Sequence, residues 1–182
     1  MASNQLNLPE IAKAYKDKLS KIKLCLFDVD GILTDGRIYW AGEEVGFNRF
    51  FHAHDGYGLK ILMKAGLKVG IITGGDSQGV LKRFELLGLD YLYYGDEDKR
   101  HAYDKVMAET GFSDEEVLYM GDEFFDLPIL QKVGFSATVP GASIEIRQAV
   151  DYITHRESGQ GCAREVIDML RHVQGIVPSI EH

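Results

Sequence analysis

Apolar runs and amphipathic segments alternate along the chain, and this alternation predicts an α/β domain with a mostly parallel sheet. Short apolar runs bounded by polar or glycine-rich turns predict strands at Lys23–Phe27, Leu67–Ile72, Tyr91–Tyr94, Val117–Met120, Gly134–Thr138 and Tyr152–Ile153. Segments with a helical period predict helices at Gly56–Ala65, Ser77–Leu87, Lys99–Thr110, Phe124–Lys132, Ala142–Val150 and Cys162–Val173. Helices that connect parallel strands cover both faces of a sheet, so we expect one layered domain over residues 1–182.

The alternation breaks between the first two strands, where residues 36–54 predict a small β-hairpin insertion. This segment, GRIYWAGEEVGFNRFFHAH, contains two strand-like runs joined by a turn at Ala41–Glu44. It is too short to form a domain of its own. Ahead of the first strand, Leu8–Leu19 predicts a helix on the outside of the domain, since Pro9 is tolerated in a first helical turn.

Composition and charge narrow the possible partners. The formal net charge is −8, with 45% hydrophobic and 26% charged residues, which is the balance of a globular protein with an acidic surface. Such a surface does not attract nucleic acid or an anionic membrane. Two cysteines make no disulfide framework, and no segment approaches the roughly 20 apolar residues of a membrane span. We therefore expect a cytoplasmic protein without a nucleic-acid or membrane partner.

Acidic residues follow two of the predicted strands, at the end where parallel sheets bind ligands. Asp28 and Asp30 follow the first strand in FDVDGILTD, and Asp122, Glu123 and Asp126 follow the fourth in YMGDEFFD. Carboxylates this close repel one another unless a cation neutralises them. Mg²⁺ suits oxygen ligands in a site that also holds a phosphate. The alternative interpretation is a set of solvated acids at strand ends.

Residues suited to anions follow the other two strands. Thr73 and Gly74 lie in IITGGDS, where a hydroxyl and backbone amides at the start of a helix could hold a phosphate. Lys99 opens the next predicted helix, where a lysine can bridge phosphate and carboxylate. Each signal alone also fits an ordinary turn or a surface lysine. The acid pair, threonine, lysine and acid cluster nevertheless fall at four successive strand ends, and this coincidence favours one phosphate-handling site.

The order DVDG, T, K, GDE and D resembles the four motifs of haloacid dehalogenase phosphatases. The segments TDGRIYW, FFHAHDGYGLKIL, DLPIL and GQGCAREVIDML further resemble the capless phosphatases of that superfamily that act on 3-deoxy-D-manno-octulosonate 8-phosphate. This resemblance runs from about Lys21 to Gly175. It implies a Rossmann-like fold of the haloacid dehalogenase type without a cap domain, and a hydrolase that uses Mg²⁺ in lipopolysaccharide precursor biosynthesis.

The resemblance also implies roles for the acidic residues. Asp28 would be the nucleophile that forms an aspartyl-phosphate, and Asp30 the general acid and base. Mg²⁺ would be bound by the side chains of Asp28 and Asp122 and by the backbone carbonyl of Asp30. Glu123 and Asp126 would orient Lys99 or metal-bound water.

Further implied roles concern the substrate and the assembly. Thr73, the amide of Gly74 and Lys99 would hold the transferring phosphoryl oxygens. Relatives with a short hairpin close their active sites as tetramers, so the hairpin Arg37–Phe51 would be an oligomerisation element of a homotetramer. Its apolar content agrees with this hypothesis, although the same side chains could cover the sheet edge of their own subunit; they are Ile38, Trp40, Val45 and Phe47.

Two departures from the family pattern concern the sugar. The substrate contacts that the resemblance implies are Thr34, His54, Asp55 and Gly75, and two of them stand where relatives carry arginine, namely His54 and Gly75. Histidine and glycine do not reproduce the bidentate grip of arginine on a carboxylate. Related phosphatases for nine-carbon sugar acids lack the second arginine, so a nonulosonate 9-phosphate is the alternative substrate.

Three other classes of protein share parts of this pattern. A phospho-receiver domain places its acid pair a strand or more before the phosphoacceptor, whereas the nucleophile here belongs to the DVD motif itself. A catalytically silent assembly module would have lost Asp28, Asp30 or Lys99, and all three are present. A mutase would carry a cap, for which the chain has no room. The sequence therefore favours a phosphatase that acts on a small sugar-acid phosphate.

Overall fold

The computed structural model describes residues 6–178, so both ends of the predicted 1–182 domain lie outside the described part. Six parallel strands form one sheet in the order β5-β4-β1-β6-β7-β8. Their bounds are β1 Leu24–Phe27, β4 Lys68–Thr73, β5 Tyr91–Tyr94, β6 Val117–Met120, β7 Phe135–Thr138 and β8 Tyr152–Ile153. All six predicted strands are confirmed to within one residue at each end.

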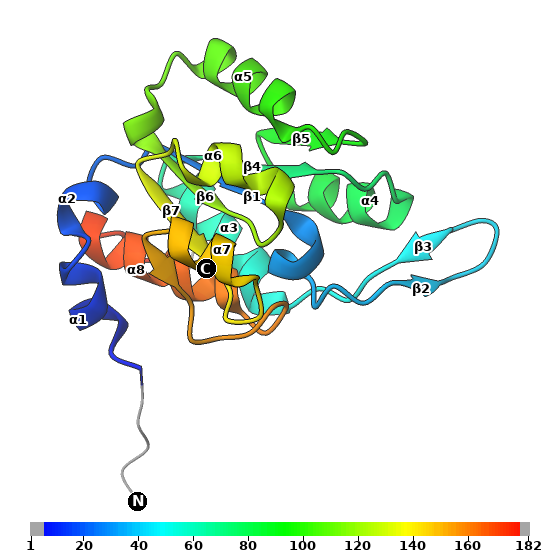
Figure 1. Ribbon diagram of the computed structural model, residues 1–182, viewed down its shortest axis with the longest axis horizontal. Coiled ribbons are helices and arrows are strands. Elements are labelled where there is room, and N and C mark those ends of the chain that lie inside the picture. Colours follow the sequence, from blue (N-terminus) through cyan, green and yellow to red (C-terminus); the bar gives the residue numbers. More distant parts are fainter. Residues whose placement is uncertain (1–5, 179–182) are drawn as a thin grey trace, which may run out of the picture.

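Helices cover both faces of this sheet, as predicted (Figure 1). The steps from β1 to β4 and β5 run in one direction and those from β6 to β7 and β8 in the other. Right-handed crossovers therefore place the connecting helices on opposite faces. In chain order the helices after β1 are α3 Ala53–Lys64, α4 Gln78–Leu87, α5 Lys99–Thr110, α6 Leu127–Leu130, α7 Ile144–Ala149 and α8 Cys162–Gln174.

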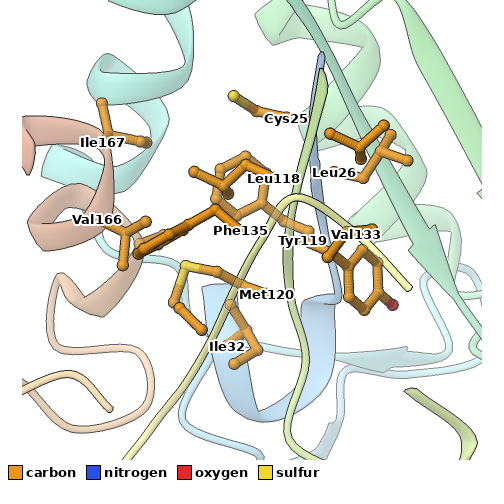
Figure 2. Close-up of a cluster of buried hydrophobic side chains, with 14 of the residues drawn as sticks. Cys25, Leu26, Ile32, Leu118, Tyr119, Met120, Val133, Phe135, Val166 and Ile167 are labelled. Atoms are coloured by element: carbon orange, nitrogen blue, oxygen red, sulfur yellow. The ribbon is translucent and has the colours of Figure 1, made fainter. Parts of the chain in front are cut away.

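The hydrophobic core lies on the strands that carry the predicted chemistry. All four residues of β1 are buried, and so are all four of β6 and of β7. Figure 2 shows Phe135 and Met120 packed near Val166 and Ile167 of α8, with Ile32 below them. Each fully buried side chain of this size stabilises the fold by about 1.5–3 kcal/mol. The sheet is therefore a rigid base for the residues at its edge.

A two-stranded antiparallel hairpin projects from the body of the molecule between β1 and α3 (Figure 1). It pairs β2 (Tyr39–Trp40) with β3 (Phe47–Asn48), and an isolated bridge between Thr34 and Phe51 closes its base. The predicted hairpin exists, but the connection spans residues 41–46 and is longer than the predicted turn Ala41–Glu44. This segment is a hairpin and not a cap domain, as the sequence predicts.

Two predicted helices are interrupted. The helix predicted at Leu8–Leu19 is divided into α1 (Leu8–Lys13) and α2 (Lys16–Leu19). Between them Tyr15 leaves helical geometry, and its ring packs edge-on against two aromatic rings of the core, those of Phe135 and Tyr152. Packing of one aromatic side chain therefore outweighs the helical pattern.

The helix predicted at Phe124–Lys132 begins as a single tight turn, η3 (Phe124–Asp126), before α6. Pro128 has no N–H to donate to the carbonyl of Phe124, so one continuous α-helix cannot form there. Two other predicted helices also have shifted bounds. Helix α3 begins at Ala53, three residues before the predicted Gly56, which shortens the insertion at residues 36–54, and α7 is shorter at both ends than predicted.

Glu165 fixes the loop after β8 to the start of α8. Its buried carboxylate accepts the hydroxyl of Tyr152 at 2.7 Å and the backbone N–H groups of His155 at 2.9 Å and Arg156 at 3.0 Å. A buried carboxylate needs such donors because it has left water. No helix within residues 6–178 combines the length and apolarity that crossing a membrane requires.

Replacing Glu165 with alanine should destabilise the fold by about 2–3 kcal/mol, because three donors lose a charged acceptor. Urea denaturation would measure this loss as a lower transition midpoint. The matched control is Glu43→Ala, which removes an exposed carboxylate in the hairpin turn and should leave the midpoint within error. Equal midpoints for the two variants would show that the network does not stabilise the fold.

Candidate active site

The carboxyl ends of four adjacent strands bring the predicted site residues to one edge of the sheet. Strands β5, β4, β1 and β6 are neighbours and parallel. Asp28 directly follows β1, Thr73 ends β4, Lys99 begins α5 after β5, and Asp122 follows β6. Ligands of open parallel sheets bind at this end of the strands. The edge is therefore the candidate active site.

Lys99 joins two carboxylates through a buried chain of ion pairs. Its Nζ lies 2.6 Å from Oδ1 of Asp28 and 2.6 Å from Oδ1 of Asp126, and all three side chains are buried. Burial opposes the charged form of Lys99, but the two carboxylates outweigh it and raise the pKa of Lys99. The ring of Phe125 lies 4.5 Å from the ammonium and adds a cation–π contact. Lys99 is thus held as a cation beside Asp28.

Asp126 organises the turn after β6. Besides Lys99, its Oδ1 accepts the hydroxyl of Tyr119 at 2.7 Å. Its Oδ2 accepts the backbone N–H groups of Asp122 and Glu123, both at 3.1 Å. Both oxygens of Asp126 are therefore engaged, and they fix the positions of the Lys99 ammonium and the Asp122 backbone.

Glu123 does not share this arrangement. Its side chain is exposed and accepts the N–H of Phe124 at 3.4 Å, so it turns back on its own helical turn. No hydrogen bond or ion pair links the Glu123 carboxylate to Lys99 within the described chain. Glu123 therefore does not contact Lys99 in this structure, because its carboxylate serves as a local cap, and its other predicted role, to orient metal-bound water, stays a prediction.

Two buried oxygens at this edge fit a divalent cation. Oδ2 of Asp28 and Oδ1 of Asp122 are buried and have no hydrogen-bond partner among residues 6–178. Asp28, Asp122 and Asp126 each offer a carboxylate oxygen within 4.8 Å of the others. Gly31 gives Asp122 room, since a Cβ there would lie 2.0 Å from Oδ2 of Asp122. These three carboxylates offer hard oxygen donors, which are the ligands that Mg²⁺ prefers.

The electrostatics of these carboxyls agree with that fit. Burial raises the pKa of Asp28 to about 7, although the Lys99 ammonium opposes the rise. Burial raises the pKa of Asp122 to about 8, and the negative charges of Asp28 and Asp126 act in the same direction. Without a bound cation, the negative charges of these carboxylates are not fully compensated. A bound divalent ion would supply the missing positive charge.

Asp30 lies beside this cluster and is held by a residue of the hairpin. Arg49 donates from Nε to Oδ1 of Asp30 and from a terminal nitrogen to Oδ2, both at 2.7 Å. On the other side, the hydroxyl of Thr34 lies 3.4 Å from Oδ1 of Asp30 and 3.2 Å from the carbonyl of Val29. Thr34 is fully buried, so its contact here is with Asp30.

Arg49 is the residue that the sequence analysis missed. The hairpin was interpreted there as an apolar oligomerisation element, and Arg49 stood among aromatic residues in FNRFF. A basic residue in an apolar segment is itself a signal, because burial of an arginine requires a carboxylate partner. The sequence does not say which of the many carboxylates that partner is.

The turn after β4 approaches Asp30 closely. The hydroxyl of Thr73 accepts the N–H of Gly75 at 3.3 Å, and Gly74 lies against Glu97. A Cβ at position 75, where the resemblance expects an arginine, would lie 3.2 Å from Arg49 and 3.5 Å from Asp30. Thr73 and Gly75 therefore lie at the same edge as the acid pair.

The other two predicted substrate residues begin α3. His54 is exposed and its ring contacts that of His52. Asp55 is buried and accepts the backbone N–H of Arg164 at 2.6 Å, which ties α3 to the first turn of α8. Burial raises the pKa of Asp55 to about 6, although the hydrogen bond from the Arg164 N–H and the positive charge of Arg156 act to lower it. No hydrogen bond within the described residues joins His54 or Asp55 to the Asp28 cluster.

Comparison with known proteins shows which family the chain resembles. The model of the haloacid dehalogenase-like hydrolases matches residues 92–166, which include Lys99 and Asp122. The 3-deoxy-D-manno-octulosonate 8-phosphate phosphatase KdsC of Salmonella typhi is 38% identical over 160 residues, 87% of this chain and 84% of that protein. KdsC of Haemophilus influenzae is 36% identical over 162 residues, 88% of each.

A solved structure shares the fold over nearly the whole chain. The octulosonate phosphatase of Moraxella catarrhalis, in complex with a magnesium ion, a phosphate ion and a KDO molecule, superimposes with a TM-score of 0.85. It is 34% identical in sequence and covers 90% of this chain and 93% of that one. The chain therefore belongs to the haloacid dehalogenase-like hydrolases and, within them, to the family of 3-deoxy-D-manno-octulosonate 8-phosphate phosphatases.

Proposed function

We propose that this chain is a magnesium-dependent phosphatase that hydrolyses 3-deoxy-D-manno-octulosonate 8-phosphate to the free sugar acid and phosphate, a step of lipopolysaccharide precursor biosynthesis. The observation that carries the proposal is the position of Asp28. One oxygen of this carboxylate is fixed by Lys99, and the other is buried without a partner among the described residues. Similarity to the KdsC phosphatases of Salmonella typhi and Haemophilus influenzae supports the substrate.

Two carboxylates divide the proposed reaction between them. Asp28 attacks phosphorus and forms an aspartyl-phosphate as the bond to the sugar oxygen breaks. Asp30, in its acid form, gives its proton to that leaving oxygen. Asp30 then accepts a proton from the water that attacks the aspartyl-phosphate, which releases phosphate and restores both carboxyl groups.

Groups around Asp28 would stabilise the charge that builds on the phosphoryl oxygens. The buried ammonium of Lys99 lies 2.6 Å from Oδ1 of Asp28 and would lie close to a phosphoryl group bound to that carboxylate. Thr73 and the amide of Gly74 extend the same edge and would donate to the phosphoryl oxygens. Fixed donors cost no reorganisation during the reaction, which is why such sites are effective in a buried setting.

Asp28 and Asp122 would hold Mg²⁺ by their side chains and Asp30 by its backbone carbonyl. When bound, the ion neutralises the carboxylates and polarises the phosphoryl oxygens. The unpartnered oxygens of Asp28 and Asp122 support this assignment, since an uncompensated buried carboxylate is costly. The magnesium ion in the Moraxella catarrhalis structure agrees with the choice of metal.

The sugar part of the substrate would extend from Asp30 towards the hairpin. An open hollow of about 680 Å³ lies there, and its lining includes Trp40, Phe47, Arg49 and Gly75. Thr34, His54 and Asp55 stay candidates for substrate contacts, although Thr34 and Asp55 are buried and bonded within the fold. A hollow on this side leaves room for either an eight-carbon or a nine-carbon acid.

Self-association of the hairpin is part of the proposal. Its large apolar side chains are exposed, with fractions of 54% for Trp40, 57% for Phe47 and 66% for Phe50. Exposed apolar groups of this density usually mark an interface. We expect a homotetramer. We also expect a cytoplasmic enzyme, because Cys25 and Cys162 are free thiols in the described fold.

Phosphate release should depend on Asp28. With Mg²⁺, wild-type protein should hydrolyse the octulosonate 8-phosphate faster than a nonulosonate 9-phosphate or a simple hexose phosphate. Asp28→Asn should lower kcat by roughly a thousandfold or more, since no other group can form the covalent intermediate. Asp17→Asn, which changes an exposed acid of α2, is the matched control. Faster turnover of the nine-carbon ester would transfer the proposal to that substrate.

Mg²⁺ affinity should rise with pH. The pKa values of Asp28 and Asp122, about 7 and about 8, lie above the ordinary 3.8, so both carboxyls bind protons near neutrality in the metal-free fold. A cation must displace those protons, and its affinity should fall by roughly tenfold or more from pH 8.5 to pH 6. Titration calorimetry in buffers of different ionisation enthalpy should detect proton release.

The same raised pKa values of Asp28 and Asp122 also affect the stability of the metal-free fold. A carboxyl with a raised folded-state pKa stabilises the fold below its unfolded value of 3.8, and this contribution is lost as pH rises through 7 and 8. Thermal stabilisation by Mg²⁺ should therefore be larger at pH 8.5 than at pH 6. Asp122→Asn should remove most of the difference. Affinity that does not change over this pH range would contradict the assignment of the cation site.

A further inference from the structure

The Arg49–Asp30 ion pair is more enclosed than a surface contact. The Arg49 side chain is 7% exposed and that of Asp30 31% exposed, and two parallel hydrogen bonds of 2.7 Å join them. Bidentate pairing of this kind fixes the plane of the carboxylate as well as its position. Burial of a guanidinium costs free energy unless a carboxylate compensates it, so Arg49 is committed to Asp30.

The hairpin segment that carries Arg49, at the end of β3, is attached to the first turn of α4. The hydroxyl of Ser77, the residue that precedes α4, donates to the carbonyl of Phe47. The side-chain amide of Asn48 lies against Gly79 and accepts the N–H of Arg49 at 2.8 Å. Three consecutive residues of the hairpin are thereby positioned, and the third reaches Asp30.

The turn after β4 and the base of the hairpin also approach the pair. Gly75 approaches so closely that a Cβ at this position would lie 3.2 Å from Arg49 and 3.5 Å from Asp30. Thr34 contacts Oδ1 of Asp30 from the base of the hairpin. Asp30 is thus held between the chain after β1, the turn after β4 and the hairpin, and a small rotation of its carboxyl would break contacts on either side.

We propose that Arg49 is a positioning residue for the acid step of Asp30. This inference rests on the proposed phosphatase function. As the bond from phosphorus to the sugar oxygen breaks and the bond to Asp28 forms, the sugar oxygen takes its proton from Asp30. The carboxylate that remains on Asp30 is the charge that Arg49 faces. The guanidinium therefore holds the acid in place and compensates the charge that develops as the proton leaves.

Arg49 acts on Asp30 and not on the phosphoryl group. Two nitrogens of the guanidinium, Nε and one terminal nitrogen, already donate to Asp30. No ion pair within the described chain joins Arg49 to Asp28, and the phosphoryl side of the site has its own cation in Lys99. Loss of Arg49 should accordingly impair departure of the leaving group more than attack on phosphorus.

Leaving-group dependence distinguishes these roles. We would measure kcat/KM, which covers the steps up to release of the leaving group, for the sugar phosphate and for p-nitrophenyl phosphate. The sugar alkoxide needs a proton to leave, whereas nitrophenolate does not. Arg49→Gln should lower kcat/KM roughly tenfold or more for the sugar ester and less than about threefold for the aryl ester. Asp30→Asn should show the same selectivity at larger amplitude.

Two further variants separate positioning from folding. Arg49→Lys keeps the charge without the fork and should recover part of the loss for the sugar ester. Arg37→Gln removes an exposed arginine of the same hairpin, which pairs with Asp35, and should behave like wild type with both esters. Thermal unfolding of all variants would show whether Arg49→Gln remains folded at the assay temperature.

Equal losses of kcat/KM for the two esters in Arg49→Gln, or a loss no larger than that of Arg37→Gln, would overturn the role of Arg49 while the phosphatase function stands. A wild-type protein that releases no phosphate from either ester with Mg²⁺ present would overturn the proposed function and this inference together. A selective loss for the sugar ester, partly recovered by Arg49→Lys in a folded protein, would establish it.

Discussion

The buried chain Asp28–Lys99–Asp126 is the interaction on which the rest of the site depends. A fully buried ammonium is tolerated because it lies 2.6 Å from two carboxylates that also raise its pKa. Asp126 in turn fixes the backbone of Asp122 through a hydrogen bond. The strand order β5-β4-β1-β6 makes this chain possible, because it brings residues that are distant in sequence to one sheet edge. Rigid strands therefore set the geometry of nucleophile, cation and metal ligands together.

The hairpin adds a second, separate constraint. Asp28 directly follows β1, whereas Asp30 lies three residues beyond the end of that strand, and its side chain is held by Arg49 and Thr34. Ser77 and Gly75 connect the hairpin to the chain after β4. A small insertion without a cap thus takes part in the active site of its own chain, in addition to any role in assembly.

Sequence patterns were sufficient to predict the parallel sheet and the residues that meet at its edge. Buried parallel strands are continuous apolar runs, and the polar residues that end them lie together for geometric reasons, so Asp28 and Lys99 could be predicted to meet. The break at Tyr15 could not, because it depends on packing against strands more than 100 residues away. Arg49 was missed for the same reason, since its partner is defined only when the hairpin folds back. The local hydrogen bond of the Glu123 carboxylate to the N–H of Phe124 could not be predicted from the sequence either, because it depends on the tight turn that precedes α6.

The most direct test of the account is whether phosphate passes through Asp28. Asp30→Asn protein, mixed with Mg²⁺ and p-nitrophenyl phosphate, whose leaving group needs no proton from Asp30, and quenched in acid within one turnover, would be digested and analysed by mass spectrometry. The account predicts a phosphoryl group on the peptide that contains Asp28, since the variant lacks the base that activates water. Phosphate release without any phosphorylated peptide, or a phosphoryl group on another residue, would contradict it.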